Sequence, residues 1–157
     1  KATLSGVVFS VNATNVSIAA TSFKVYNKTA SSDANKVTCT AYNGTTAIVG
    51  TASGVVKVDC RGLFSSTSID TAIDQGDDLT LVLEANITNT NNSTVGSASN
   101  LQVSIQQFNT IARSTYGVAT TSGISNLEWV DDDSGITQEF TWVESLDTSV
   151  KSTAYTG

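Results

Sequence analysis

Two cysteines are the residues of this 157-residue chain best suited to covalent chemistry. Cys39 lies in KVTCTAY and Cys60 in VVKVDC, and the period-two pattern puts both on the apolar face of a strand. A disulfide between them would close a loop of about twenty residues and contribute on the order of 3 kcal/mol. We predict this disulfide, with a pair of buried free thiols as the alternative. Zinc fits poorly, because there is no His and no third Cys to complete a site.

The other reactive side chains do not form a catalytic set. The chain has no His, which excludes Ser–His and Cys–His pairs and His-ligated copper. Glycoside hydrolysis needs two carboxylates across a cleft, but Glu84, Glu128 and Glu139 fall on the predicted solvent side of strands. The eleven Gly are dispersed through turns, and none forms a phosphate-binding loop at the start of a helix. We predict that the protein is not an enzyme and has no cofactor.

One acidic turn is a calcium candidate. VDDDSG places Asp131 and Asp133 close together, and Ca²⁺ prefers carboxylate oxygens. About 6–8 oxygen ligands are needed, however, and neither this turn nor the IDQGDD stretch has the spacing of an EF-hand loop. The alternative is that Asp, Ser and Gly only set the geometry of the turn. We therefore expect no bound metal.

Seven Asn-x-Ser/Thr patterns, the acceptor sites for N-linked glycans, occur along the chain. Their asparagines are Asn12, Asn15, Asn27, Asn43, Asn86, Asn91 and Asn92. Such sites mark surface positions of secreted proteins; the alternative is chance, because Ser and Thr are abundant. We expect Asn91 or Asn92 to be occupied first, since both lie in a long polar loop. Asn86 should be occupied less readily, because it is predicted on the outer face of a regular strand.

The composition indicates an extracellular protein. Only 14% of the residues are charged, the net charge is −6 and the eight Lys and Arg are scattered, so nucleic acid and anionic membranes are poor partners. No stretch approaches the roughly 20 apolar residues of a membrane span, and the opening KATLSGVVFS lacks the order of a signal peptide. The polarity comes from Ser and Thr rather than from charge. We expect a secreted or cell-surface location.

Period-two alternation runs through most of the chain and predicts β-strands. The clearest case is 79–89, where Leu79, Leu81 and Leu83 share one face. Other predicted strands cover residues 4–11, 17–26, 36–42, 47–49, 55–60 and 101–107, and a hairpin is predicted in NLEWVDDDSGITQEFTWVE. No helical period persists, and no linker divides the chain. We predict one domain over residues 1–157, an all-β antiparallel sandwich of about eight to ten strands.

Eight stretches carry a family resemblance: TSFKVYN, VTCTAY, VVKVDC, AIDQGDDLTLVLEANIT, LQVSIQQF, LEWVDDD, FTWVE and VKSTAY. In this order they resemble Ig-like β-sandwich modules of extracellular surface proteins from candidate-phyla bacteria, over residues 21–155. The resemblance implies an Ig-like fold and brings no catalytic residues. In that family a further strand precedes the one that matches residues 2–11, so this chain would start one strand late. In composition the chain is also similar to donor-strand filament subunits, which are rich in Thr, Ser and Asn.

The N-terminal segment 1–11 is apolar on both faces and requires cover on two sides. Its apolar residues are Leu4, Val7, Val8, Phe9 and Val11, with Leu4 and Val8 predicted on one face and the others on the opposite face. Either the segment is a central strand of the chain's own sheet, or it is donated to a neighbouring subunit by β-augmentation. Segment 149–157 is a second candidate for such a contact.

Together these features predict a non-catalytic structural subunit of an extracellular assembly, either a pilus-like filament or a surface layer. The expected partners are copies of the chain itself, joined through a terminal β-strand. The alternative is an adhesin or a carbohydrate-binding surface module. Sugar binders present exposed aromatic platforms, whereas Trp129 and Trp142 share the inward face of a hairpin with Phe140 and are therefore assigned to the core.

Overall fold

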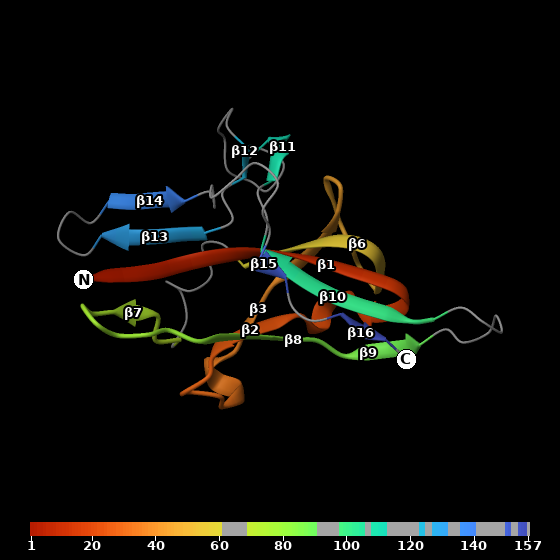
Figure 1. Cartoon of the computed structure of the whole chain (residues 1–157), viewed down its shortest axis with the longest axis horizontal. Helices are drawn as coiled ribbons and strands as arrows, with labels where there is room; N and C mark the ends of the chain where they lie inside the picture. Colours follow the sequence, from red (N-terminus) through yellow and green to blue (C-terminus); the bar gives the residue numbers. More distant parts are fainter. Residues whose placement is uncertain are drawn as a thin grey trace.

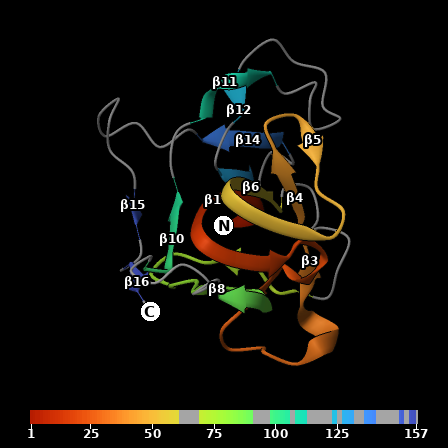
Figure 2. The same ribbon diagram turned by 90° about the vertical axis from the view of Figure 1, so that its right-hand side faces the viewer.

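The computed structural model describes residues 1–60, 69–90, 98–105, 108–112, 123–124, 127–131, 136–140, 150–151 and 154–156. These residues form an all-β structure of antiparallel sheets, as predicted, and contain no α-helix. Two short 3₁₀ helices, η1 (Ala20–Ser22) and η2 (Asp33–Asn35), lie in connections. The sheets stack in two layers (Figure 1 and Figure 2), so that each can cover the apolar face of the other.

The larger sheet is built around β1 (Ala2–Ala19), which runs along most of the molecule (Figure 1). Its beginning pairs with β13 and β7, and the rest pairs with β6, β10 and β9. The other strands of this sheet are β4 (Thr40–Asn43), β5 (Thr46–Ala47), β6 (Thr51–Asp59), β7 (Ala72–Ile73), β9 (Ile87–Thr90), β10 (Asn100–Ile105), β13 (Leu127–Asp131), β14 (Ile136–Phe140), β15 (Val150–Lys151) and β16 (Tyr155–Thr156).

The smaller sheet contains three strands in the order β3 (Val37–Thr38), β2 (Lys24–Asn27) and β8 (Leu81–Glu84). β8 is therefore an edge strand. Within the described residues it pairs only with β2. A separate two-stranded sheet consists of β11 (Phe108–Ala112) and β12 (Gly123–Ile124).

Among the described strands the chain changes layer four times, and two of these changes take place within one or two residues. β3 belongs to the smaller sheet and β4 to the larger one, with only Cys39 between them. Likewise β8 lies in the smaller sheet, whereas β9 pairs with β1. At this second crossing the Ala19 N–H donates to the Asn86 carbonyl (2.9 Å), and the Asn86 N–H donates to the Ser22 hydroxyl (2.8 Å). The prediction of one regular strand over 79–89 that includes Asn86 is thus wrong, because the chain changes sheets at residues 85–86.

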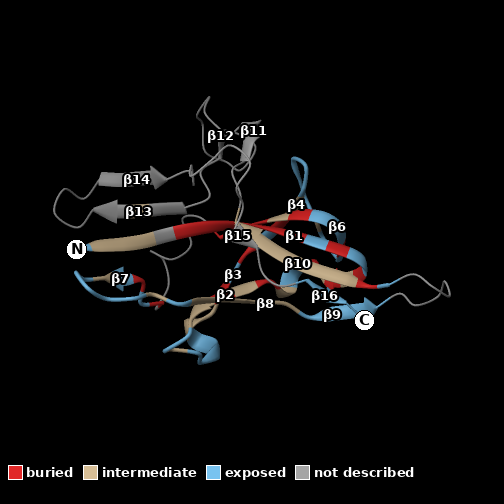
Figure 3. Ribbon diagram, in the orientation of Figure 1, coloured by how far each residue is buried: buried red, intermediate tan, exposed pale blue. Residues whose placement is uncertain are grey.

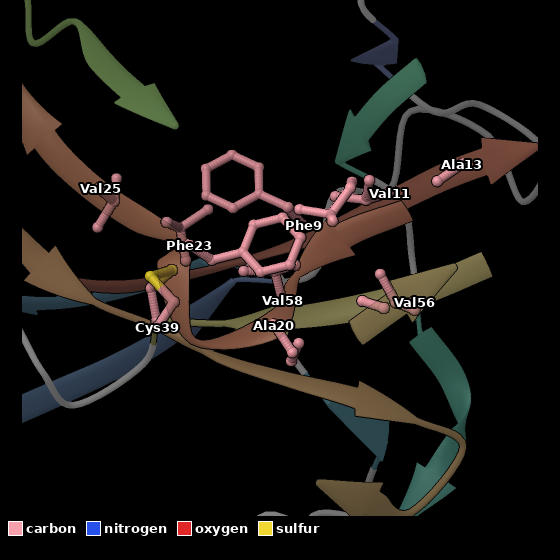
Figure 4. Packing of buried hydrophobic residues seen from close by; sticks show 14 of the residues in the cluster. Phe9, Val11, Ala13, Ala20, Phe23, Val25, Cys39, Val56 and Val58 are labelled. Carbon is pink, nitrogen blue, oxygen red and sulfur yellow. A yellow bond between two sulfur atoms is a disulfide. The ribbon is translucent and has the colours of Figure 1, made fainter. Parts of the chain in front are cut away.

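The core lies between the two layers (Figure 4). Phe23, Val25 and Val58 are fully buried, and Phe9 lies beside Phe23. Burying a side chain of this kind is worth about 1.5–3 kcal/mol relative to leaving it exposed, and this gain drives the layers together.

The N-terminal segment is an internal strand of the chain's own sheet, which was the first of the two alternatives drawn from its pattern. Ser10 pairs with Lys57 of β6 on one edge of β1 and with Ser104 of β10 on the other. Val7 and Val8 are both buried although they point to opposite faces. The two-faced apolar pattern is therefore explained within one chain.

A β-bulge changes the predicted faces of this strand. The register of β1 against β13 shifts between Leu4 and Gly6, so that one extra residue is accommodated there. As a result Leu4 lines the same interior as Val7 and Phe9. The expectation that Leu4 shares a face with Val8 is wrong for this reason.

The predicted aromatic hairpin is present. β13 and β14 pair antiparallel, with Leu127 opposite Phe140. The β13 arm adds to β1, where Trp129 is opposite Leu4 and partly buried. Trp142 lies outside the described residues. The hairpin thus extends the larger sheet beside the beginning of β1, as Figure 1 shows.

Candidate functional site

An apolar groove runs between the two layers beside β8 and β10. These two strands lie on the side of the sandwich away from β3 and β4, as the ribbon in Figure 2 shows. The central cavity of this groove has a volume of about 510 Å³ and is continued at its ends by cavities of about 420 and 450 Å³. Residues of both layers line the central cavity, among them Phe9, Phe23, Leu83, Leu101 and Val103. The central cavity shares Phe9 with one of these cavities and Ile87, Leu101 and Tyr155 with the other, and we refer to the three together as the groove.

The groove exists because two inward-facing strands are not fully covered. The alternation of β8 turns Leu81 and Leu83 inward, and that of β10 turns Leu101 and Val103 toward them. All four side chains are only partly buried, as the colouring of β8 and β10 in Figure 3 shows. The Cys39 crossing closes the opposite side of the sandwich. On the side of β8 and β10 the described chain crosses between the layers only at residues 85–86, where β8 leads into β9, and none of the described strands covers the rest of that side.

β8 also has backbone groups along this side that pair with none of the described strands. The Lys28 N–H donates to the Thr80 carbonyl (2.9 Å), and the register continues this ladder to residue 84. In an antiparallel pair, alternate residues direct their backbone groups to the same neighbour. The even-numbered residues 80–84 therefore bond to β2, whereas Leu81 and Leu83 direct N–H and C=O away from it. We call this outward side of β8 the open edge.

Two exposed apolar side chains stand at the mouth of the groove. Ile87 is 51% exposed and Tyr155 is 67% exposed, and both line the central cavity. Two other large apolar residues in the described part of the chain are comparably exposed, Val49 and Val55, and neither lines the groove. Isolated exposed apolar residues are common, but a group of them beside an apolar depression indicates an interaction site.

The one charged residue of β8 is neutralised on the outer face of the smaller sheet. Glu84 accepts hydrogen bonds from Lys36 Nζ at 2.8 and 3.0 Å. The Lys36 ammonium also lies 3.3 Å from Asp33 and 4.9 Å from the centre of the Tyr26 ring. The hydrogen bond to Glu84 raises the pKa of Lys36 above its usual value. Val82, the apolar residue that interrupts the alternation of β8, is opposite Tyr26 on this same face.

A second lysine lies in an unusual environment on the larger sheet. Lys57 of β6 has Ser10 and Tyr42 as cross-strand neighbours. Burial lowers the pKa of Lys57 to about 8. Lys57 lines none of the three cavities of the groove, so it takes no part in this site.

The predicted disulfide is confirmed. The sulfur atoms of Cys39 and Cys60 are 2.06 Å apart, and both residues are buried.

The predicted calcium candidate is only partly described: Asp131 ends β13, and Asp133 lies outside the described residues. Among the residues that the structure describes, no three His, Cys, Asp or Glu side chains are grouped so that they could hold a metal ion. No helix in this part is long and apolar enough to cross a membrane.

The glycan acceptor asparagines differ in their surroundings. Asn12, Asn43 and Asn86 are exposed. Asn15, which is also exposed, and Asn27, which is partly buried, use the side-chain nitrogen to which a glycan would be attached. Asn15 Nδ2 donates to the Ala98 carbonyl (3.0 Å), and Asn27 Nδ2 donates to the Asp70 carbonyl (2.9 Å). Asn91 and Asn92, the residues predicted to be occupied first, lie outside the described residues.

The groove and the open edge were missed from the sequence. Leu83 beside the groove and Val25 in the core belong to equally alternating stretches, and nothing in the sequence separates a covered apolar face from an open one. Comparison with known proteins adds no family to this picture, because no family model, curated protein or solved structure matches the chain.

Proposed function

We propose that the protein is a non-catalytic structural module of an extracellular assembly, a pilus-like filament or a surface layer, built from copies of the chain joined by β-strand contacts. The observation that carries this proposal is the apolar groove beside the open edge of β8. Removing the partly exposed leucines from water lowers the free energy of the associated state. Hydrogen bonds between the outward N–H and C=O groups and another strand lower it further. A single surface therefore offers both contributions to assembly.

The composition and the disulfide support the extracellular part of the proposal. Disulfides persist in oxidising compartments outside the cytosol, and the bridge here is fully buried. Only 14% of the residues are charged, which weakens the electrostatic repulsion between neighbouring copies of an assembly.

The terminal strands contribute differently from what the sequence alone indicates. Segment 1–11 has partners on both edges, so donating it to a neighbour would first require breaking its own pairing. At the other terminus, β15 and β16 pair with β10, and Tyr155 lies at the mouth of the groove. The C-terminal segment is therefore the terminal strand placed to take part in a contact at the groove.

Electron microscopy of the native material tests this proposal directly. Fibres or a lattice with a repeat the size of this module are the expected result. Purified protein should also self-associate with rising concentration in sedimentation experiments. Monodisperse single chains in both preparations would refute the assembly function and would favour an adhesin or a sugar-binding module.

A further inference from the structure

We infer that the groove is an interface between two copies of this chain, in which β8 of one copy pairs antiparallel with β8 of the other about a two-fold axis. The inference rests on the proposed self-association and identifies its contact surface. It places that contact at an internal strand, β8, instead of at a terminal segment.

The backbone of β8 suits pairing with itself. Leu81 and Leu83 direct their N–H and C=O groups outward, and in an antiparallel pair two opposite residues can exchange both hydrogen bonds. A two-fold axis beside Val82 would place Leu81 of one copy opposite Leu83 of the other, so that each outward group of this short edge would find a partner. Such an interface is isologous: the same surface serves both copies, and the contact closes at two.

The side chains of the open edge favour the same arrangement. A two-fold axis perpendicular to the smaller sheet keeps the inner faces of both copies on one side. The sheet would then continue through three strands of each copy, and the two grooves would face each other. Ile87 and Tyr155, which stand at the mouth of the groove, would lose their exposure to water. Apolar surface that is costly in the single chain becomes an interior shared by the pair.

Charge decides the direction of the pairing. The chain carries a net charge of −6, so an interface between copies must keep like charges apart. Exposed Asp77 and Asp78 line one end of the groove, whereas uncharged Ile87 and Thr90 line the other. An antiparallel pair puts the two acidic ends roughly 30 Å apart along the strand direction, well beyond the screening length in physiological salt. A parallel pair would place four carboxylates side by side. Glu84 also lines the central cavity, but it does not oppose pairing, because Lys36 neutralises its carboxylate.

Amide-resolved hydrogen exchange on the full chain, measured at low and high protein concentration alongside sedimentation velocity, tests the inference. The expected first step of association is a monomer–dimer equilibrium in which dimerisation slows exchange at the Leu81 and Leu83 amides by about tenfold or more. The Val82 and Glu84 amides, which already bond to β2, should exchange at the same rate in both states.

A pair of lysine substitutions provides the matched control. Ile87→Lys places a charge in the proposed interface and should weaken dimerisation by about tenfold or more. Val55→Lys alters a residue of similar exposure, 59% against 51%, that lies outside the groove, and should leave dimerisation unchanged. Circular dichroism should show both variants to be folded.

The outcomes separate this inference from the proposed function. Association that leaves the Leu81 and Leu83 amides unprotected, or that Val55→Lys abolishes and Ile87→Lys does not, would overturn the β8 interface while the assembly function stands. Protection of these amides together with matching new protection along the edge of a different strand would overturn the two-fold pairing, because the open edge would then be pairing with that strand. Growth of the dimers into fibres through a second surface agrees with both the inference and the proposed function. A chain that stays monomeric at every concentration would overturn both.

Discussion

Cys39 is joined by a disulfide to Cys60 at the point where the chain crosses from the smaller sheet to the larger one, with their Cα atoms 4.7 Å apart. The Cys39 N–H donates to the Phe23 carbonyl (2.9 Å), and the Cys60 N–H donates to the Val7 carbonyl (2.9 Å). The bridge therefore connects β1, β6 and the approach to β2. One covalent link holds the two layers together on the closed side of the sandwich, opposite the groove.

Replacing both cysteines by alanine should lower the free energy of unfolding by about 3 kcal/mol. The bridge closes a loop with a sequence separation of 21, and its removal restores the conformational entropy of that loop in the unfolded chain. Urea unfolding of the oxidised wild type and of Cys39→Ala/Cys60→Ala measures the difference, and reduced wild type should fall close to the double variant. A loss below about 0.5 kcal/mol would contradict the structural role of the bridge.

Phe23→Ala should lower the free energy of unfolding by about 3–5 kcal/mol, because it removes one of the largest fully buried side chains and leaves a cavity between the layers. Val49→Ala is the matched control, since Val49 is almost fully exposed and its truncation should change stability by less than about 0.5 kcal/mol. Chemical denaturation measures both. Equal effects of the two substitutions would show that Phe23 is not part of the core.

The sequence predicts this fold well where side-chain alternation has a single explanation. The Cys39–Cys60 bridge and the hairpin around Trp129 follow from residues that alternate on strands and from a turn between them. Prediction from the sequence fails where a strand leaves its sheet. Residues 79–89 keep their alternation through the crossing at 85–86, so the pattern cannot show that the backbone partners change from β2 to β1. The bulge after Leu4 is hidden in the same way, because one extra residue leaves no compositional trace.

The candidate site could not be predicted, for a related reason. Leu83 and Leu101 are apolar residues on regular strands, and the sequence predicts correctly that they point inward. Whether an inward face is covered depends on how far apart β8 and β10 lie, and that separation is set by the two crossings and by the pairing of β1. Local patterns carry no information about it.

Among the described acceptor sites, Asn43 should carry an N-linked glycan more readily than Asn15 or Asn27 in a host that glycosylates folded proteins. Asn43 is exposed at a turn, where Gly44 has a φ of 58°, a conformation that glycine adopts without strain. Asn15 and Asn27 already use Nδ2 in hydrogen bonds. Site-resolved mass spectrometry measures the occupancy, with Thr45→Ala as the control that removes only the acceptor pattern of Asn43. Higher occupancy at Asn15 or Asn27 would contradict this order.

Lys57 should make the fold more stable as the pH rises from about 8 to about 10.5. Burial lowers the pKa of Lys57 from 10.5 to about 8, so the folded chain releases this proton before the unfolded chain does. Between these two values the unfolded chain binds more protons, and stability therefore increases with pH. Because solvent still reaches part of the side chain and screens its charge, the gain should be about 1 kcal/mol, well short of the full value of the shift.

Lys57→Met isolates this contribution, because it keeps an apolar side chain of similar length and removes the titrating group. Unfolding in urea at about pH 7 and about pH 10 should show wild type gaining about 1 kcal/mol relative to Lys57→Met between the two conditions. Taking the difference between the two proteins cancels the titration of the tyrosines, which both contain. Lys28→Met, at an exposed position of the smaller layer, is the matched control and should differ from wild type by the same amount at both pH values. If the Lys57→Met difference were equally constant, the Lys57 ammonium would have to be as well hydrated in the folded chain as in the unfolded one.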